Sequence, residues 1–204
     1  MDYDFYQSKF FAKRYFKITN DGLQVHYKSL GKRHDAYLKF EDIGTKIVYF
    51  TSGKRIWLVA SVLLILLSIF LYIVRINGED VEPHAELFYV SLAMPCLACY
   101  IITFQKSCFL SKPNNIHTVD FFLDKPTKLE LTNFIEALLS RRKTYLLTRY
   151  GQLNKNLGYE FQHHNLRWLL DNDVLSHVDY TEKVMELDQL FFVKNITGFS
   201  FSPN

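Results

Sequence analysis

Cysteine is scarce in this chain, with three among 204 residues, and the spacing of the three forms no disulfide framework. A reduced compartment or burial in a membrane is therefore the expected setting of these thiols. Glycine and proline are also few, and the glycines are scattered singly rather than gathered in a phosphate-cradling loop. The sequence has no G-x-S-x-G motif, no metal-ligand spacing among its histidines and no zinc signature. We therefore expect no catalytic residue, no metal site and no cofactor.

Charge of one sign is not in excess either. The net charge of +3 is too small to indicate a nucleic-acid partner, and we expect none. Charged residues make up 22% of the chain and hydrophobic residues 49%, but these averages hide a segregation. Two long segments contain almost no charge, and they determine how the rest of the chain is organised.

The first uncharged segment, Ile56–Val74, contains no glycine and no proline. As a helix it would span about 28 Å, which is close to the thickness of the hydrocarbon core of a bilayer. A second uncharged segment, Leu87–Phe104, follows after a short polar connection. The two predict a transmembrane hairpin, with the lipid bilayer as a partner. Small or kink-forming residues that share a helix face are the expected seam of this hairpin: Ser61, Ser68, Ser91, Pro95 and Ala98.

Basic residues flank the predicted hairpin mainly on one side. Lys54 and Arg55 precede the first segment, and Lys106 and Lys112 follow the second. We expect these four residues to contact the membrane surface, because cytoplasmic flanks carry an excess of Lys and Arg. The connection 77–86 is acidic. Arg75 lies at this acidic end, against the distribution of the other basic residues, and we expect it to reach the lipid headgroups or to pair with an acid of the connection. Both termini are therefore expected in the cytoplasm, in a bacterial inner membrane.

The flanking segments indicate β-structure followed by helices. Alternation of apolar and polar residues predicts strands near 23–28 and 36–41. Short segments bounded by turn signals predict further strands near 15–19 and 47–51 before the hairpin, and near 107–110 and 116–123 after it. The aromatic residues of the first eleven positions are expected to begin a short helix. An apolar stripe predicts a helix from Thr127 to Tyr150, closed by Gly151.

This order of strands, hairpin, strands and helix resembles a pleckstrin-homology-like (PH-like) domain. The segment Tyr37-Leu38-Lys39-Phe40-Glu41-Asp42-Ile43 is similar to a strand-and-turn signature of bacterial membrane proteins with split PH-like domains. The resemblance implies a bent, seven-stranded sheet closed by the C-terminal helix and interrupted by the membrane hairpin. A phosphoinositide pocket would require basic residues in the first hairpin turn, but that turn is Asn20-Asp21-Gly22.

The C-terminal part resembles the short helical hairpins of the SHOCT type. The resemblance rests on the Leu-rich segment 166–170, on Val174-Leu175-Ser176 and on Asp179-Tyr180, while Asp173 stands where that family usually has Gly. Ser176 and Asp179 have the spacing of a helix-capping box. Such modules are thought to mediate interaction or oligomerisation, and the expected contacts with a protein partner or a second copy are Trp168, Leu169, Tyr180, Val184 and Leu187.

The predicted fold class is an α+β membrane protein: two transmembrane helices inserted in a PH-like antiparallel β-domain closed by an amphipathic helix, with a C-terminal helical hairpin. Each expected segment has its own range: N-terminal half of the β-domain 1–55, first transmembrane helix 56–76, extracytoplasmic loop 77–86, second transmembrane helix 87–105, remainder of the β-domain 106–151, linker 152–165, helical hairpin 166–190 and tail 191–204.

These expectations favour a non-enzymatic, membrane-anchored interaction or scaffold protein that belongs to a complex. Two alternatives remain open at this point. Cys96 and Cys99 form a C-x-x-C pair in the second span, which would suit a membrane thiol-disulfide oxidoreductase if a thiolate could form there. A small channel or sensor subunit built from several hairpins is the other, although neither span carries a charged stripe to line a pore.

Overall fold

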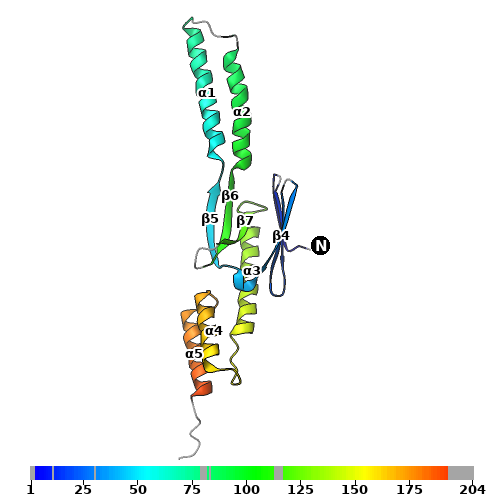
Figure 1. The fold of residues 1–204 in the computed structure, drawn as a ribbon, viewed down its shortest axis with the longest axis vertical. Helices are drawn as coiled ribbons and strands as arrows, with labels where there is room; N and C mark the ends of the chain where they lie inside the picture. The colour runs from blue at the N-terminus through cyan, green and yellow to red at the C-terminus, as the bar shows by residue number, and fades with distance from the viewer. Residues whose placement is uncertain are drawn as a thin grey trace, which may run out of the picture. The chain divides into compact units, whose positions relative to one another are not determined.

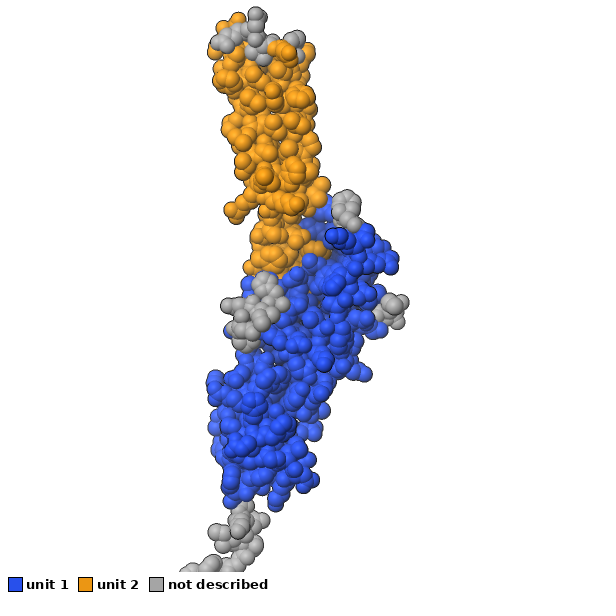
Figure 2. Space-filling model, viewed as in Figure 1, with its two compact units in different colours: residues 1–48, 109–120, 125–204 blue, residues 49–108, 121–124 orange. Residues whose placement is uncertain are grey.

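A computed structural model describes residues 3–10, 12–29, 31–78, 82, 84–112 and 117–192 of this chain, with His117 described by its backbone alone. The chain divides into two compact units (Figure 2). Unit 1 comprises residues 1–48, 109–120 and 125–204, and unit 2 comprises residues 49–108 and 121–124. Each unit is thus built from segments on both sides of the inserted helices.

An antiparallel sheet of four strands opens the chain. Its strands follow one another in sequence order: β1 (Phe5–Lys9), β2 (Ala12–Ile18), β3 (Gly22–Ser29) and β4 (Lys32–Lys39). The expected N-terminal helix is wrong, because the first residues form β1. Its side chains alternate, with Phe5 and Gln7 buried and Tyr6 exposed, so one face of the strand packs inward. The sheet therefore has an edge strand, β1, that the aromatic composition of the segment did not predict.

Helix α3 (Lys128–Tyr150) supplies the other half of the core of unit 1. It begins at Thr127, whose hydroxyl accepts from the Glu130 amide, and it ends at Gly151. The ring of Phe134 stacks on Phe5 with a centroid separation of 4.6 Å and lies 5.8 Å from the ring of Phe16. Each fully buried side chain of this kind contributes about 1.5–3 kcal/mol to folding. The predicted amphipathic helix is confirmed, and its apolar stripe covers the four-stranded sheet.

A second sheet has the strand order β5-β6-β7 and joins segments on both sides of the long helices. Strand β5 (Lys46–Ser52) precedes the helices, while β6 (Gln105–Ser111) and β7 (His117–Phe122) follow them. Along the chain, a short 3₁₀ helix, η1 (Phe40–Asp42), lies between β4 and β5. The amide of Gly44 donates to Thr118 Oγ1, and a Cβ at Gly44 would meet the Ser111 carbonyl carbon at 2.1 Å. Only glycine fits where these two backbones meet.

Helices α1 (Arg55–Ile76) and α2 (Ala85–Thr103) are inserted between β5 and β6 (Figure 1). Within the described residues, these two helices are long and apolar enough to cross a membrane. Most of their large apolar side chains are exposed, whereas the core helix of a soluble protein would be mostly buried. The expected interruption of a sheet by a hairpin of two apolar helices is therefore present, but the single seven-stranded sheet is wrong, because the strands form one sheet of four and one of three and only the latter is interrupted.

Two further helices, α4 (Tyr159–Asp171) and α5 (His177–Phe191), complete unit 1. The expected linker 152–165 is too long, because α4 begins inside it. Its first turns are held by the buried amide of Gln162, which accepts from the Asn154 amide and donates to the Asn154 and Leu157 carbonyls. A polar residue thus occupies the buried helix face, so the apolar periodicity begins only at Leu166. The capping box of Ser176 and Asp179 is confirmed at the start of α5.

Candidate functional site

Two serine hydroxyls join the apolar helices. Ser61 Oγ donates to the carbonyl of Ala93 over 3.2 Å, and Ser68 Oγ donates to the carbonyl of Glu86 over 2.8 Å. Both serines are buried, as is Ala93 on the opposing helix. Their small side chains allow the two backbones to approach closely. The hydrogen bonds to the opposing carbonyls satisfy the serine hydroxyl groups where water is excluded. The seam of the hairpin therefore runs along Ser61 and Ser68 on α1.

On α2 the expected seam is wrong. Ser91, Pro95 and Ala98 are all exposed, and the Ser91 hydroxyl donates to the Phe88 carbonyl of its own helix. Ala93 takes their place against α1. Small size alone does not reveal which side of a helix faces its neighbour, because α2 carries small residues around its circumference.

The ends of the hairpin differ in charge. Arg75 near the end of α1 forms an ion pair with Glu86 in the first turn of α2. This is the pairing with an acid that the position of Arg75, against the distribution of the other basic residues, required. Glu79 and Asp80 of the acidic connection lie outside the described residues. At the other end, Lys54, Arg55 and Lys106 are exposed. Lys112 differs from the expectation, because its ammonium group pairs with Asp42 at 3.1 Å.

The C-x-x-C pair lies on the second apolar helix. Cys96 and Cys99 are half-buried free thiols, and Cys108 is a buried free thiol of β6. This placement neither assigns nor removes a redox role, so the thiol alternative stays a prediction.

The expected partner-binding residues fall mainly in the interior of the α4–α5 hairpin. Leu169 and Leu187 are completely buried, which makes them core residues that no partner can reach, and their assignment is wrong. Trp168 is half-buried and packs edge-on against Tyr150, with 5.2 Å between ring centroids. Tyr180 and Val184 are also half-buried, and the Tyr180 hydroxyl lies 3.3 Å from His163 Nε2. The apolar periodicity of the sequence marked the inner face of the hairpin.

The outer face of α5 carries apolar residues that the sequence reasoning missed. Val178 is 67% exposed and Met185 is 52% exposed, and they stand seven residues apart on one side of the helix. Both line a shallow groove of about 410 Å³ together with His177, Thr181 and Glu182. A repeat of seven residues outside the core-facing stripe was the signal that could have identified them.

Arg142 of α3 ties the α4–α5 hairpin to the rest of unit 1. Its Nε donates to the Phe40 carbonyl over 3.0 Å, and its terminal nitrogen Nη1 donates to the Asn172 carbonyl over 3.3 Å. Burial lowers the pKa of this guanidinium, while the nearby carboxylates of Asp173 and Glu41 oppose that shift. One side chain thus holds the turn after the first sheet and the turn between α4 and α5.

Asp173 makes the second tie between these parts. Its φ of 57° lies in the left-handed region that usually favours glycine. Its carboxylate Oδ2 accepts from Thr45 Oγ1 over 2.7 Å, a contact that glycine could not form. This hydrogen bond offsets the backbone cost and explains why Asp can stand in this turn.

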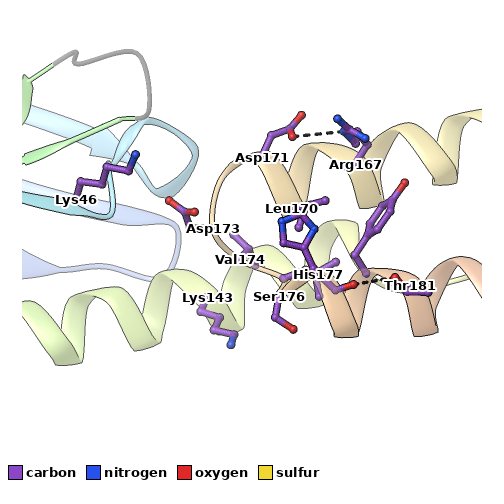
Figure 3. Close-up of a pocket in the computed structure, with 12 residues that line it drawn as sticks. Lys46, Lys143, Arg167, Leu170, Asp171, Asp173, Val174, Ser176, His177 and Thr181 are labelled. Atoms are coloured by element: carbon purple, nitrogen blue, oxygen red, sulfur yellow. Dashed lines mark hydrogen bonds and ion pairs between the residues drawn. The ribbon is translucent and has the colours of Figure 1, made fainter.

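An open groove of about 820 Å³ lies beside this turn (Figure 3). Lys46, Lys143 and Arg167 line it together with Asp171 and Asp173, and Arg167 pairs with Asp171 at 3.4 Å. Because its charges are mixed and partly paired, the groove does not favour a ligand of one sign.

No protein-family model, no curated protein and no solved structure matches this chain. Among the residues that the structure describes, no group of three or more His, Cys, Asp or Glu side chains could hold a metal ion. The site and the fold therefore define an α+β chain with two helices that could cross a membrane and a C-terminal helical hairpin held in place by Arg142 and Asp173.

Proposed function

We propose that this chain is a non-enzymatic interaction protein anchored in a membrane by α1 and α2. The exposure of these helices carries the proposal: apolar side chains such as Leu63, Leu66 and Phe88 are uncovered, while Ser61 and Ser68 turn inward. An apolar surface of this extent requires a cover, and a bilayer covers two helices on every side except their seam. The denial of a catalytic role rests on the absence of catalytic motifs from the sequence.

Membrane fractionation tests the anchor. The tagged chain should stay in the membrane pellet after alkaline carbonate washing, and recovery in the supernatant would contradict the proposal. Leu66→Arg should reduce the inserted fraction, since an arginine at the centre of a membrane helix costs about 2.5–3.5 kcal/mol on insertion scales. Phe161→Arg on α4 is the matched control, because it places the same side chain on an exposed apolar position outside the hairpin.

Both termini are proposed to lie in the cytoplasm of a bacterium, with the hairpin in its inner membrane. Lys54, Arg55 and Lys106 support this orientation, since they are exposed beside the hairpin ends that connect to β5 and β6. The ion pair between Arg75 and Glu86 supports it further, because it neutralises the basic residue near the opposite end of α1. The bacterial setting follows from the resemblance to split PH-like proteins.

The two sheets and α3 are proposed to form a PH-like domain. What supports this is the element order: four strands, then three strands divided by the inserted helices, then one helix. The α4–α5 hairpin is proposed to be of the SHOCT type, supported by its Ser176 capping box and its Leu169 core. In this arrangement the β-domain is the scaffold and the helical hairpin presents the interaction surface.

The outer face of α5 is the proposed contact for a protein partner or a second copy. Val178 and Met185 support this placement, because they are exposed apolar residues beside a groove. The full-length tagged chain, purified in mild detergent, should bring down a partner or behave as an oligomer. Met185→Lys should abolish that association, whereas Ser140→Lys on an exposed position of α3 should preserve it. A strictly monomeric, partner-free chain would contradict the proposal.

A further inference from the structure

A row of three cations crosses the outer face of the four-stranded sheet. In the strand register, Lys13 of β2 is opposite Lys28 of β3, and Lys28 is opposite Arg33 of β4. Residues directly opposite each other point to the same face, so the three side chains emerge side by side. All three are exposed, and no described residue forms an ion pair with any of them.

Such a row of like charges lowers the stability of the sheet on which it lies. Like charges directly opposite each other on neighbouring strands destabilise the pairing, and Lys28 has a cation on either side. The adjacent row on the same face does hold an acid, Asp35, but its carboxylate lies 2.5 Å from Nδ1 of His26. The three cations are therefore left for an anion from outside the described chain.

Aromatic rings occupy the adjacent row of the same face. Tyr15 is opposite His26, which is opposite Asp35, two residues along the strands from the cation row. Tyr3 lies against both rings, with centroids 4.9 Å from Tyr15 and 5.5 Å from His26. Two residues of a strand span about 7 Å, which sets the distance between the cations and the rings. A ligand that used both rows would need an anion and a planar ring at that separation.

A cavity of about 420 Å³ joins the two rows. Its lining includes Tyr3, Tyr15 and His26 from the aromatic side, and Lys28 and Arg33 from the cationic side. This volume lies in the range of small-molecule sites. Asp35 also lines the cavity and presents a carboxylate that could accept from the hydroxyl groups of a ribose.

We propose that this cavity binds a nucleotide. Lys28 and Arg33 hold the phosphate through charge-assisted hydrogen bonds, and the ring of Tyr3, which also lines the cavity, stacks on the base. An inorganic phosphate or an aliphatic lipid headgroup would use the cations but leave the rings without a role. The inference is independent of the membrane anchor, since it rests on the register and the side chains of the four-stranded sheet.

Binding of adenosine 5′-monophosphate to the full chain in phosphatidylcholine nanodiscs tests the proposal. Calorimetric titration should give a Kd below about 1 mM, and inorganic phosphate should bind at least about tenfold more weakly. Lys28→Ala and Arg33→Ala should each raise the Kd for the nucleotide at least about tenfold. Lys17→Ala is the control: it removes an exposed lysine from β2 outside the cavity, and the Kd should stay within about twofold.

Several results would contradict the proposed nucleotide site. The first is the absence of binding at millimolar nucleotide, and the second is an affinity for inorganic phosphate equal to that for the nucleotide. If Lys17→Ala weakened binding as much as Arg33→Ala, general charge rather than this cavity would be responsible. Loss of nucleotide binding in nanodiscs that contain phosphatidylglycerol would assign the cations to lipid headgroups instead. Arg33→Glu keeps the proposal testable if the alanine variants fold poorly, because it replaces a repulsive cross-strand pair by an attractive one and should still abolish binding.

Discussion

Arg142 and its neighbour Arg141 show that position on a helix determines whether an arginine is buried and contributes to the fold. The two arginines are adjacent on α3, but Arg142 is only 3% exposed whereas Arg141 lies in solvent. The buried guanidinium serves the carbonyls of Phe40 and Asn172, so its removal would leave two acceptors without their donor. The basic residues 141–143, whose composition predicts a solvated helix end, thus include one residue, Arg142, that stabilises the fold.

Arg142→Ala should lower the free energy of unfolding of unit 1 by about 2–4 kcal/mol, since buried hydrogen bonds to a charged group are lost. Arg141→Ala should change it by less than about 0.5 kcal/mol, as expected for an exposed residue. Urea unfolding of the full chain in detergent, in a Trp57→Phe background that leaves Trp168 as the one tryptophan of the sequence, measures both by fluorescence. Equal effects of the two variants would show that Arg142 does not hold the helical hairpin.

The capping box at the start of α5 gives a pH dependence. Hydrogen bonds from Ser176 lower the pKa of Asp179 below its ordinary value of about 3.9. Because the folded pKa is the lower one, the ionised carboxylate favours the folded helix above pH 4, and this contribution is lost as the pH falls through the folded pKa. The first turn of α5 should therefore fray in acid.

NMR chemical shifts of the His177–Asp179 amides, followed from pH 6 to pH 2, measure this loss. We expect a titration with a midpoint below 3.9 that is absent from Asp179→Asn. A titration of the same amplitude in that variant would assign the effect to another group.

At the scale of elements, the register of the strands brings together residues that are far apart in the sequence. Lys13, Lys28 and Arg33 form one row only because β2, β3 and β4 pair as they do. A shift of one strand by a single residue would move its cation to the other face of the sheet. The row therefore belongs to the sheet and not to any local motif.

The row has a consequence for stability. Lys28→Glu should raise the free energy of unfolding by about 0.5–2 kcal/mol, because two repulsive cross-strand pairs become attractive. Lys17→Glu should have little effect, since Lys17 is opposite the neutral Gln24. Thermal unfolding in low salt compares the two variants. A Lys28→Glu variant no more stable than Lys17→Glu would show that the three cations do not repel one another.

The whole molecule is arranged around one insertion, since β5 and β6 are neighbours in a sheet although the two apolar helices separate them in the chain. This connection requires both ends of the α1–α2 hairpin to return to the same sheet. If the helices span a bilayer, the described residues before α1 and after α2 therefore lie on the same side of it.

Cysteine labelling tests that arrangement. In a background with Cys96, Cys99 and Cys108 replaced by Ala, a membrane-impermeant maleimide applied to intact bacterial spheroplasts should label Asn77→Cys and spare Lys155→Cys. Both positions are exposed, one directly after α1 and the other between α3 and α4. Labelling of Lys155→Cys alone would reverse the proposed orientation, and equal labelling of both would contradict a spanning hairpin.

Much of the architecture follows from local pattern. The uncharged segments predicted α1 and α2, alternation and turn signals together predicted six of the strands, and the spacing of Ser176 and Asp179 predicted a cap that the structure confirms. These features depend on the period of a helix or strand and on near neighbours, so a sequence can reveal them. Strand β1 was missed because its closely spaced aromatic residues also suit a helix.

What the sequence by itself determined is therefore the identity and order of most elements, including the insertion of two apolar helices into a β-domain. Only the tertiary structure decided that Ala93 rather than Ser91 faces α1, that Leu169 and Leu187 are core residues, and that Arg142 joins distant turns. The reason is physical: the rotation of a packed helix and the register of a strand are set by side chains remote in sequence. Burial follows from that packing, and the candidate sites follow from burial.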